Sequence, residues 1–81
     1  MGAVDLRSVL RRHLALAERH VARGKLIIGR QRYLVAELER DGHDSDEARD
    51  LLETFLDVQR SYEEDHERIT RELRALPVQS I

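Results

Sequence analysis

Mostly apolar positions follow one another in alternating steps of four and three, and this spacing restricts the fold more than any other feature of the sequence. The first series contains Leu6, Leu10, His13, Ala17, His20, Gly24, Ile27, Gln31, Leu34 and Leu38. A second, aliphatic row runs beside it at intervals of seven: Leu14, Val21, Ile28 and Val35. Such spacing places these residues on one side of an α-helix and is typical of helices that pack along their length, as in a coiled coil.

Two glycines occur within this stretch, but the spacing of the apolar positions does not change there. Gly24 and Gly29 lie five residues apart, and each costs a helix about 1 kcal/mol relative to alanine. A real break would reset the phase of the apolar series, yet the series continues through both positions. We therefore expect one helix over residues 5–40. A three-helix fold with a break near Gly24 is the alternative.

The next segment carries the signals of a turn followed by a second helix. Gly42 is suited to the left-handed residue that ends a helix, and Asp44 or Ser45 is suited to the N-cap of the next one. Asp44 with Glu47 resembles a capping box. Pro77 disfavours helix at the residue before it. The sequence thus predicts a turn over 41–45, a second helix over 46–76 and a tail over 77–81, all within one domain, 1–81.

The second helix repeats the stepped pattern of the first. Its series is Ala48, Leu52, Phe55, Gln59, Tyr62, His66, Ile69, Leu73 and Leu76, and it is widened near the turn by Leu51, Leu56 and Val58. Folding the chain at the turn pairs the two series and predicts an all-α, antiparallel two-helix hairpin. In the simplest register Gly24 lies opposite Tyr62, leaving room for its ring, and His20 lies opposite His66.

A chain of 81 residues without cysteine is marginally stable alone, and small domains without disulfides often recruit a second copy. Once the first series faces the second helix, the aliphatic row would remain uncovered along one side. We therefore expect a homodimer that forms a four-helix bundle. The predicted oligomer interface is Leu14, Val21, Ile28 and Val35.

Charge is distributed unevenly. Residues 1–40 hold nine Lys/Arg and four Asp/Glu, whereas residues 41–81 hold five and twelve. The basic side chains of the first helix are Arg7, Arg11, Arg12, Arg19, Arg23, Lys25, Arg30 and Arg32. They suggest a nucleic-acid-binding accessory factor as an alternative function. Acidic residues interrupt this surface and no set of stacking aromatics accompanies it, so we expect a solvated, ion-paired face.

Three histidines stand in the apolar series: His13, His20 and His66. Glu63 and His66 form a Glu-x-x-His pair, which di-iron bundles use together with carboxylates on other helices. The first helix offers no carboxylate in its series, so His20, Glu63 and His66 are weak candidates for metal ligands. The alternative is that the histidines are half-buried polar groups that define register and partner choice.

No serine has an evident histidine base, and no glycine-rich phosphate loop is present. The sequence therefore predicts no enzyme, no catalytic residue and no cofactor. The longest aliphatic run, Leu26-Ile27-Ile28, is far too short to span a membrane, and no apolar signal segment is evident. We expect a cytoplasmic protein without a membrane partner.

Several local features together resemble a group of short, uncharacterised bacterial helical proteins, mostly from proteobacteria. They are the spacing of His13 and His20, Ile28 followed by the run "RQRYLVAELERDGHD", and "ARDLLETF" in the second helix. The resemblance spans about 60 residues and implies the hairpin fold without adding a catalytic residue. The expected function is a small self-associating protein that acts through contacts with its own copies or with a further protein partner.

Overall fold

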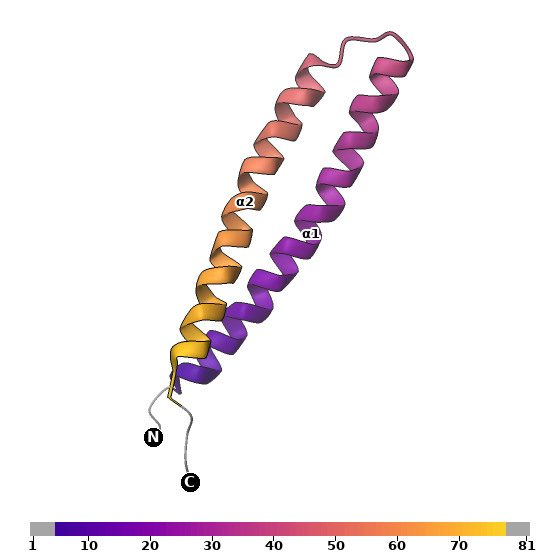
Figure 1. Cartoon of the computed structure of the whole chain (residues 1–81). Coiled ribbons are helices and arrows are strands. Elements are labelled where there is room, and N and C mark those ends of the chain that lie inside the picture. The colour runs from indigo at the N-terminus through magenta and orange to yellow at the C-terminus, as the bar shows by residue number, and fades with distance from the viewer. Residues whose placement is uncertain (1–4, 78–81) are drawn as a thin grey trace.

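The computed structural model describes residues 5–77, which form two long helices joined by a short turn. Helix α1 spans Leu6–Arg40 and helix α2 spans Asp46–Ala75, and they run antiparallel as a hairpin with the turn at one end (Figure 1). The hairpin measures 65 × 21 × 15 Å. Because α1 continues through Gly24 and Gly29, the single-helix prediction is confirmed and the three-helix alternative is wrong.

Both ends of α1 are closed by specific hydrogen bonds. At its start, the carboxylate of Asp5 accepts from the Arg7 N–H and from the Ser8 hydroxyl, each at 3.1 Å. At its end, Gly42 adopts a positive φ of 75°. The Gly42 N–H donates to the Glu39 carbonyl at 3.2 Å, and the His43 N–H donates to the Leu38 carbonyl at 2.8 Å. These two bonds constitute a Schellman motif, which satisfies the free carbonyls of the last turn.

Helix α2 has Ser45 at its N-cap position, one of the two residues expected there, but Asp44 bonds to Asp46 and not to Glu47 as a capping box would require. The Asp46 N–H donates to the Asp44 carboxylate at 3.0 Å, whereas Ser45, at the N-cap position, makes no side-chain cap bond. At the other end, Leu76 is extended, with φ −69° and ψ 141°, as the following Pro77 requires. Residues 78–81 of the expected tail lie outside the described residues.

The row expected to stay uncovered instead packs against α2 of the same chain; it consists of Leu14, Val21, Ile28 and Val35. Ile28 and Val35 are only 7% and 8% exposed. Leu14 packs against the buried cluster around Ile69. The seam between the helices therefore combines this row with the series of Leu10, Ala17, Gly24, Gln31 and Leu38. The prediction that the aliphatic row would be exposed in the hairpin is wrong.

A comparison with the neighbouring row on α1 explains why the aliphatic row faces α2. The neighbouring row consists of Leu6, His13, His20, Ile27 and Leu34. That row has the same spacing of seven but contains polar members, His13 and His20. Burying an aliphatic side chain gains about 1.5–3 kcal/mol, whereas burying an imidazole requires hydrogen-bond partners. The helices accordingly bury the aliphatic row. His13 is exposed, and His20 is left half-buried at the edge of the seam.

Two buried glutamines connect the helices across the seam. Gln59 of α2 donates its Nε2 hydrogen to the Val21 carbonyl of α1 at 2.9 Å. Gln31 of α1 donates to the Ala48 carbonyl of α2 at 2.8 Å. Both glutamine side chains are within the interior of the hairpin. Each helix thus donates one side-chain amide to the backbone of the other.

Gly24 provides the space for one of these amides. A Cβ atom built on Gly24 would lie 1.7 Å from Oε1 of Gln59. The expected role of Gly24, to make room for a side chain of the second helix, is therefore confirmed, but the side chain is Gln59 and not Tyr62. Tyr62 instead stacks on His20, with ring centroids 4.8 Å apart. Near the middle of the seam, α2 is displaced by about one layer from the simplest register.

Candidate self-association face

One broad side of the hairpin carries apolar side chains that α1 and α2 leave open. Its position follows from the His20–Tyr62 stack and from a shallow hollow beside it, which His13, Leu16, His20, Tyr62, Asp65 and Arg68 help to line. Residues that precede or follow these at intervals of seven lie on the same side, because two turns of a helix return nearly to the same direction. From His20, Tyr62 and Asp65 these intervals lead toward the turn to a set of five apolar residues. From Leu16 and Arg68 they lead to polar side chains: Arg23, Arg30, Ser61 and Thr54.

We call this set the apolar face; it consists of Ile27 and Leu34 from α1 and of Leu51, Phe55 and Val58 from α2. Leu34, Leu51 and Val58 are 44%, 45% and 44% exposed, and Ile27 and Phe55 are half-buried. Large apolar side chains that gather on one side of a small protein mark an interaction surface. The sequence contained part of this signal, since Leu51 and Val58 widen the apolar series of α2 near the turn.

Farther from the turn the same side carries polar side chains beside the exposed Leu16. We call this part the histidine end; it consists of His13, His20, Tyr62 and Asp65. Arg68 lies beside it and is held by Asp65 and by Glu72, whose carboxylate accepts at 2.8 Å. The hydrogen bond with Asp65, and next that with Glu72, raises the pKa of the Arg68 guanidinium. This ion-paired arginine makes the histidine end unlike the apolar face in both polarity and charge.

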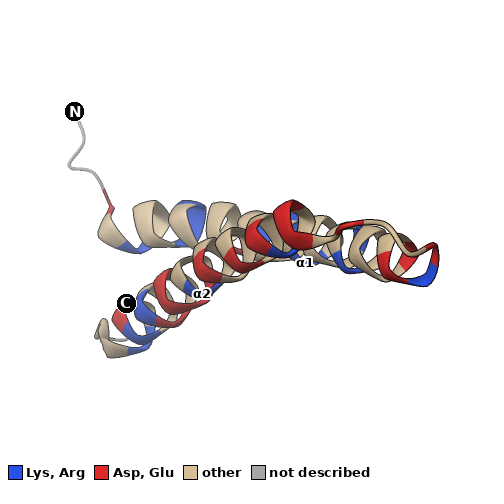
Figure 2. Ribbon diagram, turned by 90° about the horizontal axis from the view of Figure 1, so that it is seen from above, with Lys and Arg blue, Asp and Glu red and all other residues tan. Residues whose placement is uncertain are grey.

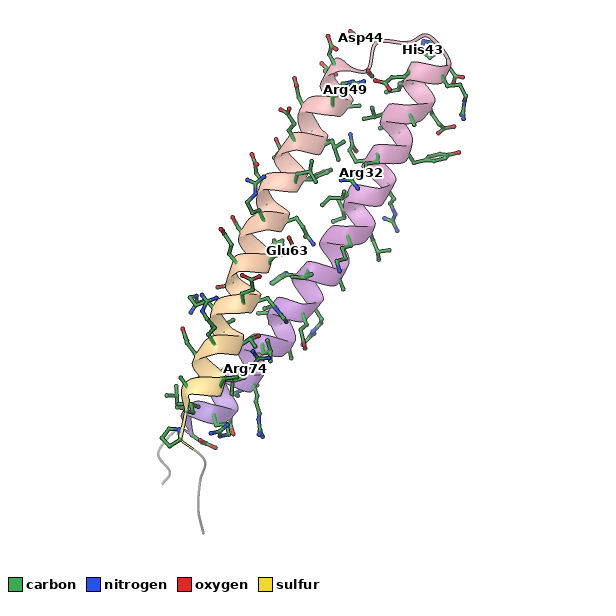
Figure 3. All side chains as sticks on the ribbon, in the orientation of Figure 1. Arg32, His43, Asp44, Arg49, Glu63 and Arg74 are labelled. Atoms are coloured by element: carbon green, nitrogen blue, oxygen red, sulfur yellow. The ribbon has the colours of Figure 1, made fainter. Side chains whose placement is uncertain are left out.

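The opposite side of the hairpin is charged. Glu18 of α1 lies 3.8 Å from Nε2 of His66, and Glu39 forms an ion pair with Arg49 of α2. At intervals of seven between these pairs stand Lys25 and Arg32 on α1 and Leu56 and Glu63 on α2. Leu56 lines a hollow there together with Leu52 and the charged Arg49 and Glu53. Figure 3 shows the labelled Arg32, Arg49 and Glu63 beside the seam. Of the two broad sides, the one with the apolar face is therefore suited to packing against another protein.

The weak metal candidates are not brought together. His20 stacks on Tyr62 at one side of the seam, whereas His66 lies near Glu18 at the other. Within residues 5–77, no three His, Cys, Asp or Glu side chains form a group that could hold a metal ion. His20 thus makes a ring-stacking contact and His66 a contact with a carboxylate, each across the seam; the alternative interpretation, in which the histidines define register, stays a prediction.

The basic side chains of α1 differ from the expected ion-paired face. Among the residues that the structure describes, the ion pairs of lysine and arginine involve only Arg40, Arg49, Arg60 and Arg68. None involves the eight basic residues from Arg7 to Arg32. Figure 2 shows that the acidic residues are concentrated along α2. The face is solvated, as expected, because all of these side chains except the half-buried Arg7 are exposed, but the expected ion pairs are not formed within the described residues.

Comparison with protein-family models, curated proteins and solved structures finds no match for this chain. The resemblance to short bacterial helical proteins therefore stays a prediction. In the described part of the chain, neither helix combines the length and the apolar character that crossing a membrane requires.

Proposed function

We propose that this chain is a structural protein that pairs with a second copy through the apolar face and acts, as a four-helix bundle, by protein–protein contacts. The observation that carries the proposal is the incomplete core of the hairpin. No side chain in the described residues is fully buried, and large apolar side chains are left open on one side. The proposal includes the expectation from the sequence that the dimer acts in the cytoplasm of a bacterium.

The exposed area of the chain supports the same proposal. The chain exposes 6583 Å², whereas a compact monomer of this mass exposes about 5,000 Å². An elongated hairpin exposes more area than a compact monomer, and a second copy packed along it would cover part of that area, roughly 800 Å² per partner in a standard protein interface. A hairpin one helix thick has no second layer to cover its apolar side, and a second copy supplies one.

Light scattering on two matched variants tests this proposal. The unmodified chain at micromolar concentration is expected to show twice the 9.5 kDa chain mass. Leu34→Glu places a charge on the apolar face and is expected to give the monomer mass. Leu26→Glu is the control, because Leu26 is 64% exposed but lies on the outer side of α1, away from the seam. A monomeric unmodified chain, or loss of the dimer in both variants alike, would overturn the proposal.

The unpaired basic side chains of α1 favour a second candidate function, an accessory factor that binds nucleic acid. Phosphate contacts from lysine and arginine make binding steeply dependent on salt. A fluorescent single-stranded RNA is the probe, titrated with protein at several salt concentrations. Arg19→Gln should lower the salt slope by about one contact, whereas Arg60→Gln, whose side chain is paired with Asp57, should not. Binding that is absent at low salt would remove this candidate.

A further inference from the structure

The open side of the hairpin is not uniform along its length. Its half near the turn is the apolar face, where Leu34 and Val58 are each 44% exposed. Its half near the chain ends is the histidine end, with the His20–Tyr62 stack and the carboxylate of Asp65. A second copy packed on this side therefore meets different surfaces in different orientations.

Twofold symmetry allows two ways of stacking these hairpins face to face. With the axis parallel to the helices, both turns lie at the same end and each α1 lies on the partner's α2. With the axis across the helices, the turns lie at opposite ends and each α1 lies on the partner's α1. The two arrangements bury the same side of each chain, so its apolar character alone does not choose between them.

The apolar pattern favours turns at the same end. In that arrangement residues at equal distance from the turn meet, so the apolar face of one copy covers the apolar face of the other. With turns at opposite ends, the apolar face would cover the partner's histidine end, including Asp65. Covering the Asp65–Arg68 ion pair or an imidazole with aliphatic side chains is unfavourable, because these groups lose their contact with water.

The charges of the two helices favour the same arrangement independently. Helix α1 contains nine Lys/Arg and three Asp/Glu, whereas α2 contains five Lys/Arg and ten Asp/Glu. Figure 2 shows this concentration of acidic residues on α2. Turns at the same end place each basic α1 on an acidic α2, whereas turns at opposite ends place α1 on α1. Juxtaposed like charges disfavour an interface, and complementary charges favour it.

We propose that the dimer is assembled with both turns at the same end, each α1 lying against the α2 of the second copy. This inference rests on the proposed self-association and specifies its geometry. The resulting rod has two different ends. The two turns, each with His43 and Asp44 exposed, form one end. The helix ends at Leu6 and Ala75 of both copies form the other. Two identical turns side by side give a partner protein a bivalent contact at one tip.

The absence of cysteine from the chain allows a direct distance measurement. A single His43→Cys substitution introduces a site for a spin label in the turn, where the side chain is exposed. Turns at the same end should give a label separation of about 30 Å or less, because neighbouring helices pack 8–10 Å apart. Turns at opposite ends should give about 50 Å, since a 35-residue helix rises about 1.5 Å per residue.

A second label site guards against a local effect of the first. Ser8→Cys, exposed in the first turn of α1, should also give the short separation, whereas turns at opposite ends would give about 45 Å because a helix rises about 1.5 Å per residue. Short distances from both sites support the proposal. Long distances from dimeric samples overturn this geometry but leave self-association intact. Monomer mass in light scattering, with no measurable dipolar coupling, overturns the proposed self-association as well.

Discussion

Gln59 and Gly24 show how one residue pair determines the alignment of two long helices. The Nε2 atom of Gln59 donates to Val21, while its Oε1 atom is buried without a hydrogen-bond partner in the space that Gly24 leaves. A buried amide tolerates few positions, because a lost hydrogen bond at a buried polar atom costs about 1–3 kcal/mol. Apolar residues at neighbouring layers are more interchangeable, so the glutamines define the register.

The two glycines of α1 should respond differently to alanine. Gly29→Ala is expected to raise the free energy of unfolding by about 1 kcal/mol, since nothing lies within 4 Å of the added Cβ. The free energy of unfolding of Gly24→Ala should be about 1–3 kcal/mol lower than that of Gly29→Ala, because the added Cβ displaces the Gln59 amide from its hydrogen bond. Chemical denaturation measures both values.

A double variant identifies the cause of that difference. In a Gln59→Ala background the space beside Gly24 is vacated, so Gly24→Ala should stabilise the protein as much as Gly29→Ala does. The interaction energy from this cycle isolates the contact between the two positions. Equal stabilisation by both glycine variants in the unmodified chain would contradict the register described here.

At the scale of elements, the turn separates the two helices through backbone geometry more than through side-chain capping. The Schellman motif at the end of α1 depends on the positive φ of Gly42. Asp44 then caps α2 through the Asp46 N–H, which leaves Ser45 to bond instead with Glu39 at 3.4 Å. The turn therefore ends one helix and starts the next within five residues.

Gly42→Ala should lower the free energy of unfolding by about 1–2 kcal/mol, because a left-handed conformation brings Cβ close to the next carbonyl oxygen. No neighbour lies within 4 Å of the added Cβ, so the effect reports backbone conformation alone. Denaturant titration gives the value, and Gly29→Ala serves as a control with the same chemical change but the opposite expected sign. An unchanged or raised stability for Gly42→Ala would contradict the assignment of the motif.

At the scale of the whole molecule, a rod 15 Å thick in its smallest dimension cannot enclose a core between two layers. Among residues 5–77 the buried apolar residues number five: Leu10, Ala17, Ile28, Val35 and Ile69. In the proposed dimer, the second copy supplies further apolar burial. Folding and association are therefore expected to be coupled.

This coupling predicts that thermal stability depends on protein concentration. Raising the chain concentration a hundredfold should raise the melting temperature, because a partner that binds only the folded chain stabilises it by mass action. Circular dichroism at 222 nm, where α-helices have a strong negative signal, measures the melting temperature at each concentration in the series. Leu34→Glu should remove the dependence and Leu26→Glu should retain it. A melting temperature independent of concentration for the unmodified chain would contradict coupled folding and association.

The sequence by itself determined the two helices, their turn and the face that α2 buries. These features depend on local chemistry: the unbroken register through Gly24 and Gly29, the left-handed residue Gly42, the proline after Leu76, and the spacing that includes Gln59. Each acts within a few residues along the chain, so spacing and residue type are sufficient to recognise it.

Only the tertiary structure decided which row of α1 faces α2 and how the helices are aligned. The rows that contain Val21 and His20 follow the same period of seven, and periodicity alone does not separate two adjacent rows. Packing separated them because the aliphatic row gains more by burial. Alignment was decided by where the Gln59 amide reaches the Val21 carbonyl and the space at Gly24. That geometry exists only after the two helices meet.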